Sequence, residues 1–427
     1  MIDIKLLRQD ADGVRAALAR RLDPALDQSL DRLAVLDRRR REVLTRSERL
    51  KAQRNLASEE VARRKKAGQP ADDLLADLKR TAEEAKALDA EVSQVEAELD
   101  GILQRVPNLP LAVVPDGDAS ANATVKEVGR LPELSFTARP HWELGAALGL
   151  FDLARGAKLS GAGFPLFTGT GARLVRALKN FLLDLHTREH GYMEVSPPLL
   201  VTRASMTGTG QLPKFEDDLY RTTEDDLFLI PTAEVPVTNI YRDEILEGSS
   251  LPLGLCAFTP CFRREAGAAG KDTRGLIRVH QFDKVELVRF CRPEDSPDQL
   301  ETMTRHAETA LERLDIPYRR VALAAGDTGF ASARTFDLEV WAAGVGGWLE
   351  ASSASTFTDF QARRANIRFR REPGQKPEFV HTLNASGVAF PRTLIALLEN
   401  NQQADGSVRV PPALVPYLGV DRLIPRG

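Results

Sequence analysis

A heptad repeat between residue 71 and about residue 105 constrains the fold of this chain more than any other pattern. Apolar or small side chains recur there in alternating steps of four and three, at Leu74, Leu78, Thr81, Ala85, Leu88, Val92, Val95, Leu99 and Ile102. The stretch before it, from Leu26 to about Ala67, lacks proline and glycine, and only Gly68-Gln69-Pro70 separates the two. Two helices joined by so short a break fold back on each other. The pattern predicts an antiparallel coiled-coil hairpin over about residues 27–104.

Charge divides this hairpin into a basic first helix and an acidic second helix. The cations that we expect to face an RNA are Arg38, Arg39, Arg41, Arg46, Arg49, Arg54, Arg63, Arg64 and Lys65. The same charges could instead pair across the hairpin, as they do in many coiled coils. Exposed pairs contribute under about 1 kcal/mol each, however, and runs of like charge repel within one helix. A basic strip along a projecting arm suits the regularly spaced phosphates of an RNA helix.

The composition excludes several classes of protein. A chain of 427 residues is too long for one core and predicts two or three domains. The net charge of −3 excludes wholesale affinity for nucleic acid, so RNA binding has to come from a local patch. Three cysteines make neither a disulfide framework nor a zinc site, which favours a reducing compartment and no zinc. Without a signal peptide or an apolar run of roughly 18 residues, we expect a soluble, cytoplasmic protein with no membrane contact.

The segment from Val106 to Asp118 is rich in proline and glycine and marks a domain boundary. Beyond it the chain changes from long helical patterns to short strands, turns and helices. We therefore expect a helical domain over residues 1–106, a linker over 107–118 and a second domain over 119–427. The fold class that follows is α+β.

The second domain holds two strand-like runs on either side of a glycine-rich loop, Ala266 to Gly275. The apolar residues that indicate these strands are Leu255, Ala257, Phe258, Ile277, Val279, Val285 and Leu287. Since side chains alternate across a strand, one face of the pair would carry Arg263, Glu265, His280, Phe282, Lys284 and Glu286. Arginine binds phosphate, phenylalanine stacks on a base and glutamate accepts an ammonium or hydroxyl group. The set suits a nucleotide with an amine-bearing co-substrate, and an exposed charged hairpin is the alternative.

Three further stretches carry residue types suited to binding. Thr232 and Glu234 follow an apolar run and could receive a small polar ligand, although a helix N-cap explains them equally well. Glu350 and Ser353 offer hard oxygen ligands to a Mg²⁺ ion held mainly by phosphates and water. A proline opens a later helix with Arg392 directly after it, where a bound phosphate would offset the unfavourable helix dipole. The chain has no GxxxxGKS or GxxxxGKT sequence, so ATP would not bind in a P-loop.

The two strand-like runs and the glycine-rich loop between them contain FRREAG (262–267), DTRGLIR (272–278) and HQFDKVE (280–286). These sequences resemble motif 2 of the class II aminoacyl-tRNA synthetases, in the form carried by seryl-tRNA synthetases. Residues 192–201 resemble motif 1, which supplies dimer contacts in that family. Arg392 and the helix that it opens resemble motif 3, and TGTGQLPKF (207–215) resembles a further signature of the family. The resemblance covers nearly the whole chain. It implies a class II catalytic domain, with a mixed and mainly antiparallel sheet flanked by helices, behind the helical arm.

The resemblance also implies a reaction and its partners. The family activates L-serine with ATP to seryl-adenylate and transfers serine to the 3′ end of tRNA(Ser), and of tRNA(Sec) where it is present. The arm would bind the tRNA, the enzyme would be a homodimer, and Mg²⁺ would assist. The departures from the family pattern are Ala354 in place of a cysteine, Thr356 in place of an asparagine and Pro391 in place of a glycine found in some relatives.

Site residues carry over position by position from the resemblance. The catalytic residues would be Arg263, Glu350 and Arg392. The ATP contacts would be Arg263, Arg264, Glu265, Val279, Phe282, Glu350, Ala351, Ser352, Ser353 and Arg392. The serine contacts would be Thr232, Ala233, Glu234, Glu286, Asn384 and Ser386, and the metal ligands would be Glu350 and Ser353.

Two alternatives stay open at the level of the sequence. The first is a ligase of the same fold that loads an amino acid onto a carrier protein, although such proteins lack a long arm and tend to bind zinc. The second is a non-catalytic coiled-coil RNA-binding protein. The joint presence of Arg263, Glu265, Phe282, Glu286, Glu350 and Arg392 speaks against the second.

Overall fold

The chain divides into two compact units. A computed structural model describes residues 1–266 and 273–425. The helical unit comprises Ile2–Ala19 and Asp23–Pro107, and the sheet unit comprises Met1, Arg20–Leu22 and Asn108–Gly427. In the described part of the chain no helix is long and apolar enough to cross a membrane.

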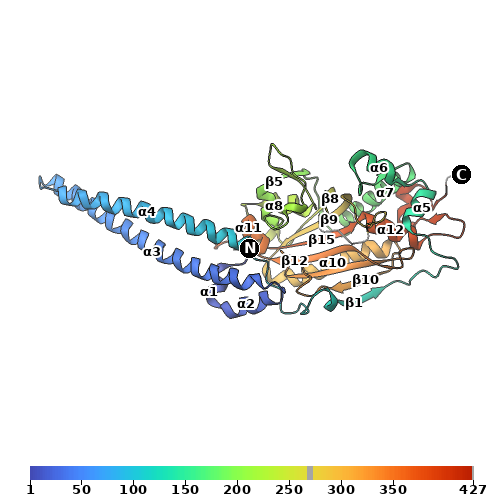
Figure 1. The fold of residues 1–427 in the computed structure, drawn as a ribbon, viewed down its shortest axis with the longest axis horizontal. Coiled ribbons are helices and arrows are strands. Elements are labelled where there is room, and N and C mark those ends of the chain that lie inside the picture. The colour runs from blue at the N-terminus through green and yellow to red at the C-terminus, as the bar shows by residue number, and fades with distance from the viewer. Residues whose placement is uncertain (267–272, 426–427) are drawn as a thin grey trace. The chain divides into compact units, whose positions relative to one another are not determined.

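The helical unit is an antiparallel hairpin of two long helices with two short helices at its base (Figure 1). Its elements are α1 (Ile4–Gln9), α2 (Ala11–Ala19), α3 (Ala25–Lys66) and α4 (Asp72–Leu103). The seam buries Val43 of α3 against Leu88 and Val92 of α4. The chain reverses after α3 through Gly68, whose φ of 68° favours glycine. The predicted coiled-coil hairpin is confirmed, with the two helices ending within a residue or two of the expected limits.

Opposite charges pair across the hairpin at several places. Arg39 donates to Glu91 at 2.7 Å and Arg40 to Glu96 at 2.8 Å, and Arg46 pairs with Glu84. Other cations of the first helix are exposed and form no ion pair with any described residue: Arg38, Arg49, Arg54 and Lys65. Pairing therefore accounts for part of the basic strip, and a second group of cations stays available to a ligand.

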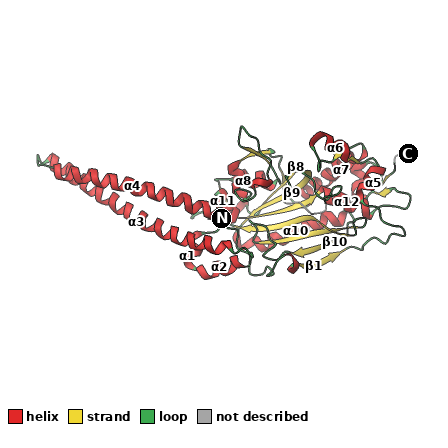
Figure 2. Cartoon of the chain, viewed as in Figure 1, coloured by secondary structure: helices red, strands yellow, loops and turns green. Residues whose placement is uncertain are grey.

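The sheet unit is built on one twisted sheet with helices packed against it (Figure 2). Within the described residues the sheet has eight strands in the order β1-β10-β11-β12-β15-β9-β8-β4, antiparallel except for β4 beside β8. The strands are β1 (Ala123–Val128), β4 (Met193–Glu194), β8 (Leu253–Phe262), β9 (Gln281–Cys291), β10 (Tyr318–Ala322), β11 (Arg334–Ala342), β12 (Gly347–Thr358) and β15 (His381–Ala389). The predicted mixed, mainly antiparallel sheet is confirmed.

Helices and small sheets complete the unit. The helices are α5 (His141–Ala147), α6 (Leu153–Ser160), α7 (Thr170–Asp184), α8 (Arg203–Thr209), α9 (Glu234–Thr238), α10 (Ser296–Arg313), α11 (Phe360–Ala365), α12 (Phe390–Asn400) and α13 (Val415–Leu418). The short strands are β2 (Phe151–Asp152), β3 (Leu166–Phe167), β5 (Leu200–Thr202), β6 (Leu227–Leu229), β7 (Ile245–Glu247), β13 (Arg368–Arg370), β14 (Glu378–Phe379), β16 (Val408–Arg409) and β17 (Arg422–Leu423).

The pleat of β9 separates an apolar face from a polar face. Val285 and Leu287 join the main core, to which α7, α10 and α12 contribute most of the helical side chains. Phe282, Lys284 and Glu286 alternate with them and lie on the opposite face. The sheet therefore presents its polar side chains together on the face away from the main core.

The hairpin around the glycine-rich loop differs from the prediction in its limits. β9 begins at Gln281 rather than near Ile277, and Arg263 and Glu265 follow the end of β8. Glu265 has φ 51° and Gly275 has φ 67°, and such left-handed backbone cannot continue a strand. The predicted loop over Ala266–Gly275 includes residues 267–272, which lie outside the described residues.

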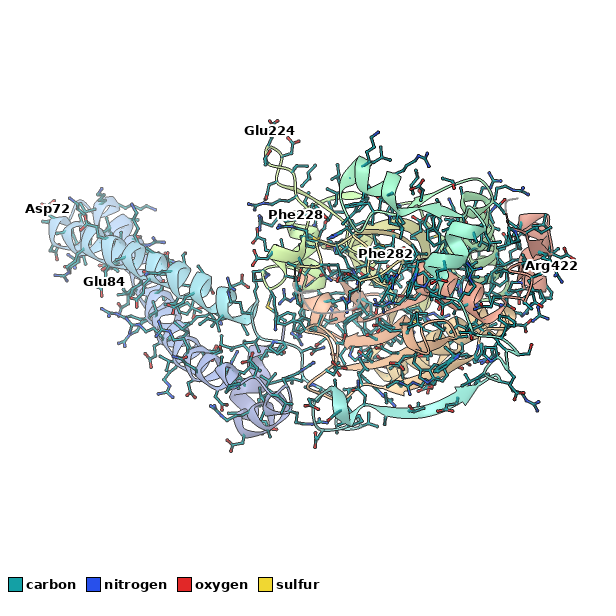
Figure 3. The ribbon with its side chains drawn as sticks, turned by 45° about the vertical axis from the view of Figure 1, so that its right-hand side comes forward. Asp72, Glu84, Glu224, Phe228, Phe282 and Arg422 are labelled. Atoms are coloured by element: carbon teal, nitrogen blue, oxygen red, sulfur yellow. The ribbon has the colours of Figure 1, made fainter. Side chains whose placement is uncertain are left out.

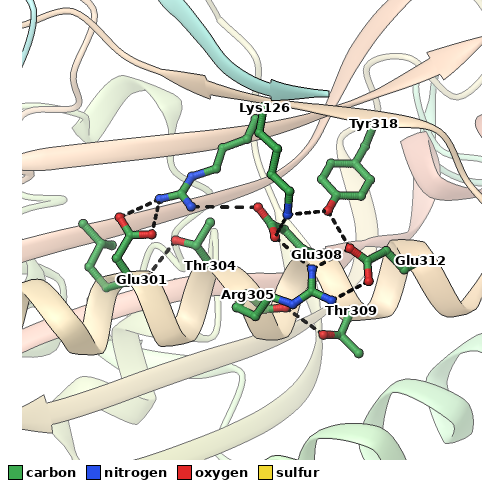
Figure 4. A network of polar contacts seen from close by, with 10 residues as sticks. Lys126, Glu301, Thr304, Arg305, Glu308, Thr309, Glu312 and Tyr318 are labelled. Carbon is green, nitrogen blue, oxygen red and sulfur yellow. Dashed lines mark hydrogen bonds and ion pairs between the residues drawn. The ribbon is translucent and has the colours of Figure 1, made fainter. Parts of the chain in front are cut away.

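A polar network fixes α10 to the edge of the sheet (Figure 4). The carboxylate of Glu308 is 1% exposed and lies 2.5 Å from Lys126 Nζ and 3.0 Å from Arg305 Nη1. Tyr318 of β10 donates to Glu312 at 2.8 Å in the same network. Because a buried charge is tolerated only when it is paired, these contacts hold the helix and the edge strands in one arrangement.

Replacing Glu308 by alanine would leave the cations around it without their shared anion. We expect the free energy of unfolding to fall by roughly 3–5 kcal/mol, the usual cost of breaking a buried ion pair from one side. Urea unfolding of Glu308→Ala measures this. Glu301→Ala is the matched control, because Glu301 lies on the same helix as Glu308 and pairs with Arg320 of β10 while half exposed. Its loss should cost under about 1 kcal/mol. Equal losses for the two variants would contradict the role of Glu308.

Candidate active site

One cavity in the sheet unit gathers residues that are far apart in the chain. Arg263 reaches it from the end of β8, Phe282 from β9, Glu350 from β12 and Arg392 from the first turn of α12. Other predicted residues that line it are Glu265, Val279, Ala351, Ser352 and Ser386. It encloses about 730 Å³, with the open space at its mouth included. Figure 3 shows Phe282 among the strands at the centre of the sheet unit.

The two arginines of this cavity are held by different elements. The Arg263 guanidinium lies over the Phe282 ring, 5.2 Å from its centroid, and its Nε is 3.3 Å from the Pro231 carbonyl oxygen. Arg392 donates from Nη1 to the Glu350 carbonyl oxygen at 2.7 Å. Because the Phe282 ring and two guanidinium groups line one cavity, the cavity can stack a base and neutralise a chain of phosphates.

A cluster of buried polar side chains lies next to the nucleotide-sized cavity. Asn384 Nδ2 donates to Glu234 Oε2 and to Glu286 Oε1, both at 3.0 Å. Lys284 donates to the Thr232 hydroxyl at 2.8 Å and forms an ion pair with Glu286. The cluster thus has two carboxylates, one ammonium, one amide and one hydroxyl, which suits a small ligand that carries both a charged amine and a hydroxyl group.

Burial and, to a smaller extent, the charge of Glu286 raise the pKa of Glu234 to about 7, although Gln361 and Lys284 act to lower it. The side chain is 7% exposed, so the ionised form is costly unless a cation or a donor compensates it. A bound ammonium group would supply this compensation. Strongly shifted carboxyl groups in a cavity are typical of functional sites.

No role was assigned from the sequence to Lys284, which belongs to the cluster, or to Gln361, which contacts it. Lys284 was expected on the same face as Phe282 and Glu286, but its bond to Thr232 joins two segments that no strand pattern relates. Gln361 of α11 is fully buried and donates to Glu234 Oε1 at 2.6 Å, while its own oxygen accepts from Thr382 at 2.8 Å. No local sequence signal could have placed it there.

A cation site of Glu350 and Ser353 depends on an irregularity in β12. Residues three apart point to opposite faces of a regular strand, but the register shifts between Leu338 and Glu339 of the partner strand. The extra residue lets Glu350 and Ser353 line one cavity together with Asp337.

Asp337 adds an acceptor to this cavity. Its Oδ1 is buried without a hydrogen-bond partner among the described residues, and burial raises the pKa of its carboxyl group well above the usual range. Hard oxygen atoms with one orphaned acceptor fit a Mg²⁺ ion. Among the described residues, no group of three or more His, Cys, Asp or Glu side chains could hold a metal ion.

The structure does not bring every predicted residue to the cavities. Arg264 is exposed and donates to the Asp217 carbonyl oxygen at 3.2 Å, away from the lining. Ala233 is buried in a neighbouring apolar cluster. Ser353 lies outside the cavity of the two arginines, as do Glu234 and Asn384, which line an adjoining one. His280 precedes β9 and stacks on Phe164 at 5.3 Å instead of joining Phe282.

The residues that depart from the family pattern have ordinary structural partners. Ala354 is buried in the main core, and the Thr356 hydroxyl lies 2.9 Å from the Ser296 hydroxyl. Pro391 occupies the start of α12, where its fixed φ suits a first turn.

An antiparallel sheet with two arginines, a phenylalanine and carboxylates over one cavity defines the class II aminoacyl-tRNA synthetases. In agreement, residues 214–401 match the tRNA synthetase class II core domain (G, H, P, S and T), and residues 1–110 match the seryl-tRNA synthetase N-terminal domain.

Full-length relatives narrow the class to one family. The chain is 57% identical to a serine–tRNA ligase of Gemmatimonas aurantiaca, over 98% of this chain and 99% of the relative. It is 53% identical to one of Carboxydothermus hydrogenoformans, over 99% of each chain. The crystal structure of seryl-tRNA synthetase from Pyrococcus horikoshii complexed with ATP superimposes with a TM-score of 0.95 at 38% identity, over the whole of both chains. The chain belongs to the seryl-tRNA synthetase family.

The raised pKa of Glu234 makes the stability of the protein depend on pH. Since this pKa is about 7 in the folded protein and 4.5 for an unperturbed glutamate, the cost of ionising the buried carboxyl is absent below about pH 4.5 and complete above about pH 7. From about pH 5 to pH 8, wild type should lose up to roughly 3 kcal/mol of unfolding free energy relative to Glu234→Gln. Urea unfolding at both pH values measures the difference. Glu224→Gln, at the exposed end of a projecting loop (Figure 3), is the control, and parallel pH profiles for wild type and Glu234→Gln would contradict the shift.

Proposed function

We propose that this protein is a serine–tRNA ligase that activates L-serine with ATP and transfers the serine to tRNA(Ser). The observation that carries the proposal is that Arg263 and Arg392 line one cavity beside Phe282 and the buried carboxylate cluster. The match of residues 1–110 to the family's N-terminal domain disfavours the carrier-protein ligase, which lacks such an arm. The presence of Arg263, Glu350 and Arg392 in one cavity disfavours a non-catalytic protein.

The first half-reaction is an in-line displacement at the α-phosphorus of ATP. The adenine stacks on Phe282, and Arg263 binds the α-phosphate while Arg392 binds the γ-phosphate. A carboxylate oxygen of serine forms a bond to the α-phosphorus, and the bond from that phosphorus to the bridging oxygen breaks, which releases pyrophosphate. The serine carboxylate is already ionised at neutral pH, so no general base is needed. Fixed positive charge that neutralises the developing negative charge accounts for the catalysis.

A magnesium ion would be held by Glu350 and Ser353 together with phosphate oxygens. When bound it would supply positive charge that offsets the negative charge of the phosphate oxygens. The protein's own part is to keep the two ligands on one side of β12 through the register shift between Leu338 and Glu339. Arg392 also contacts Glu350, through the carbonyl oxygen at 2.7 Å, so the metal ligand and the phosphate ligand are placed by a common contact.

Selection of serine depends on buried polar groups that need a partner. We assign the substrate ammonium to Glu234 and Thr232, and its hydroxyl to Glu286 with Ser386 at the same level of the sheet. Asn384 holds both carboxylates at 3.0 Å. Alanine would leave the partners of the hydroxyl unpaired, and threonine would have to fit an extra methyl group.

The second half-reaction needs the tRNA. A hydroxyl group of its terminal ribose attacks the carbonyl carbon of seryl-adenylate, forms the ester and releases AMP. We assign recognition of the tRNA body to the helical unit, through Arg38, Arg39, Arg41, Arg46, Arg49, Arg54, Arg63, Arg64 and Lys65. The shape of the RNA helix and its phosphates would be recognised rather than base edges, so tRNA(Sec) with a similar body would also be charged where it is present.

We further propose a homodimer formed through residues 192–201, on the family resemblance of that segment. Its strand β4 lies at the edge of the sheet, with Met193 half exposed, which leaves an edge for a partner. The cytoplasm is the compartment we assign, because ATP and tRNA are available there to a translation enzyme.

The amino acid dependence of ATP–pyrophosphate exchange tests the proposed function. Purified protein with Mg²⁺ should exchange pyrophosphate with serine, and alanine should be slower in kcat/KM by on the order of 10³-fold or more, because the hydroxyl partners stay unpaired. The assay is run across the twenty amino acids. Exchange that is equally fast with alanine or glycine would overturn the assignment of serine.

Neutralising part of the arm tests its role in tRNA binding. The triple variant Arg38→Ala, Arg49→Ala and Arg54→Ala removes exposed cations that form no ion pair with a described residue. It should raise the KM for tRNA(Ser) roughly tenfold and flatten the salt dependence of binding. Serine-dependent exchange should stay unchanged. The matched control replaces three exposed cations of the acidic helix α4, Lys79, Arg80 and Lys86, by alanine. If the two triple variants raise the KM equally, the basic strip is not the binding surface.

A further inference from the structure

A buried histidine and a buried glutamate lie outside the cavities, where the proposed reaction gives them no part. The side chains of His141, in the first turn of α5, and Glu399, near the end of α12, are both fully buried. His141 Nδ1 lies 2.8 Å from Glu399 Oε1, and the backbone N–H of Leu276 donates to His141 Nε2 at 2.9 Å. The pair thus connects α5 and α12 with the segment that follows the glycine-rich loop.

The partners of His141 determine where its proton lies. A backbone N–H can only donate, so Nε2 has to offer its lone pair to Leu276. The neutral ring then carries its proton on Nδ1 and donates it to Glu399. Neither the other neutral tautomer nor the imidazolium ion could accept from Leu276.

Glu399 fixes this tautomer because all of its contacts are with donors. Oε1 accepts from the backbone N–H of His141 at 2.8 Å as well as from its ring. Oε2 accepts from the backbone N–H groups of Gly344 and Val345, at 2.7 and 2.9 Å. A glutamine amide has one accepting and one donating end, so it could not satisfy both sides.

The segment held by His141 forms part of the nucleotide cavity. Ile277, directly after Leu276, lines the cavity and accepts from Arg392 Nε at 3.4 Å. Arg278, which also lines it, pairs with Glu265 at 2.8 Å. Arg392 lies two turns before Glu399 on the same helix, so the pair joins this wall of the cavity to the element that carries the arginine.

The backbone at Gly275 passes very close to the His141 ring. A side chain at Gly275 would place its Cβ 2.2 Å from His141 Nε2, so only glycine lets the chain pass at hydrogen-bonding distance. On the other side, the Arg274 guanidinium lies 4.4 Å from the centroid of the Trp142 ring. Arg274 and Leu276 are therefore held by two consecutive residues of α5, Trp142 and His141.

We propose that His141 and Glu399 are positioning residues that hold the segment Leu276–Val279 in the form that binds ATP. They touch neither substrate, and they act through Leu276 and Ile277 on the wall of the cavity and on Arg392. The proposal rests on the proposed function, because it assigns the cavity to ATP. Loss of the pair would weaken the binding of ATP and leave the serine cluster intact, because none of its residues contacts His141 or Glu399 in the described structure.

Substitutions at His141 separate a positioning role from a packing role. His141→Phe keeps a ring but offers no acceptor to Leu276, so it should raise the KM for ATP in serine-dependent exchange roughly tenfold, with the KM for serine within about twofold of wild type. His141→Gln can accept at the position of Nε2 and should recover most of the loss. Glu399→Gln should resemble His141→Phe. His381→Phe is the matched control, because the buried Nδ1 of His381 has no partner among the described residues.

The outcomes are distinct from those that test the function itself. Equal effects of phenylalanine and glutamine at position 141, or equal rises in the KM values of both substrates, would overturn the proposal. Failure of wild type to exchange with serine would overturn the proposed function instead. A ¹⁵N spectrum of the six histidines of wild type needs neither activity nor a stable variant. It should show His141 protonated on Nδ1 alone, and a proton on Nε2 would also overturn the proposal.

Discussion

The alternation of side chains across the strands at the centre of the antiparallel sheet is the constraint on which the site depends. Val285 and Leu287 must enter the main core because α7, α10 and α12 cover that face with apolar side chains. Lys284 and Glu286, one position away, are therefore forced onto the opposite face. The register that pairs Ser386 with Glu286 brings the next strand's polar residues to the same level. A slip of one residue would exchange the two faces and abolish both the core and the site.

The same constraint buries charged side chains in a place where water cannot stabilise them. Burying Glu234 beside Glu286 is unfavourable, and Lys284, Asn384 and Gln361 compensate for part of this cost. The raised pKa of Glu234 reports the part that is not compensated. A ligand with an ammonium group would compensate the rest of the unfavourable free energy of the ionised Glu234. The site would therefore favour ligands that carry this group.

The sequence predicted features that depend on local periodicity or on the chemistry of neighbouring residues. The heptad positions from Leu74 to Ile102 predicted the long hairpin, and strand alternation predicted the common face of Phe282, Lys284 and Glu286. Features that depend on distant pairing were not accessible. The start of β9 at Gln281 follows from left-handed backbone at Glu265 and Gly275. The common side of Glu350 and Ser353 requires a register shift that their spacing does not indicate. Gln361 and His141 acquire their partners only across the fold, and no pattern in their own segments relates them to the site.

The central claim is that the β8–β9 hairpin and α12 bring Arg263 and Arg392 to one triphosphate. A crystal structure of the protein with ATP and Mg²⁺ tests it most directly. The account predicts adenine on the Phe282 ring, the α-phosphate at Arg263, the γ-phosphate at Arg392 and the metal at Glu350 and Ser353. A nucleotide bound elsewhere, or one with either arginine turned away from its phosphates, would contradict the account.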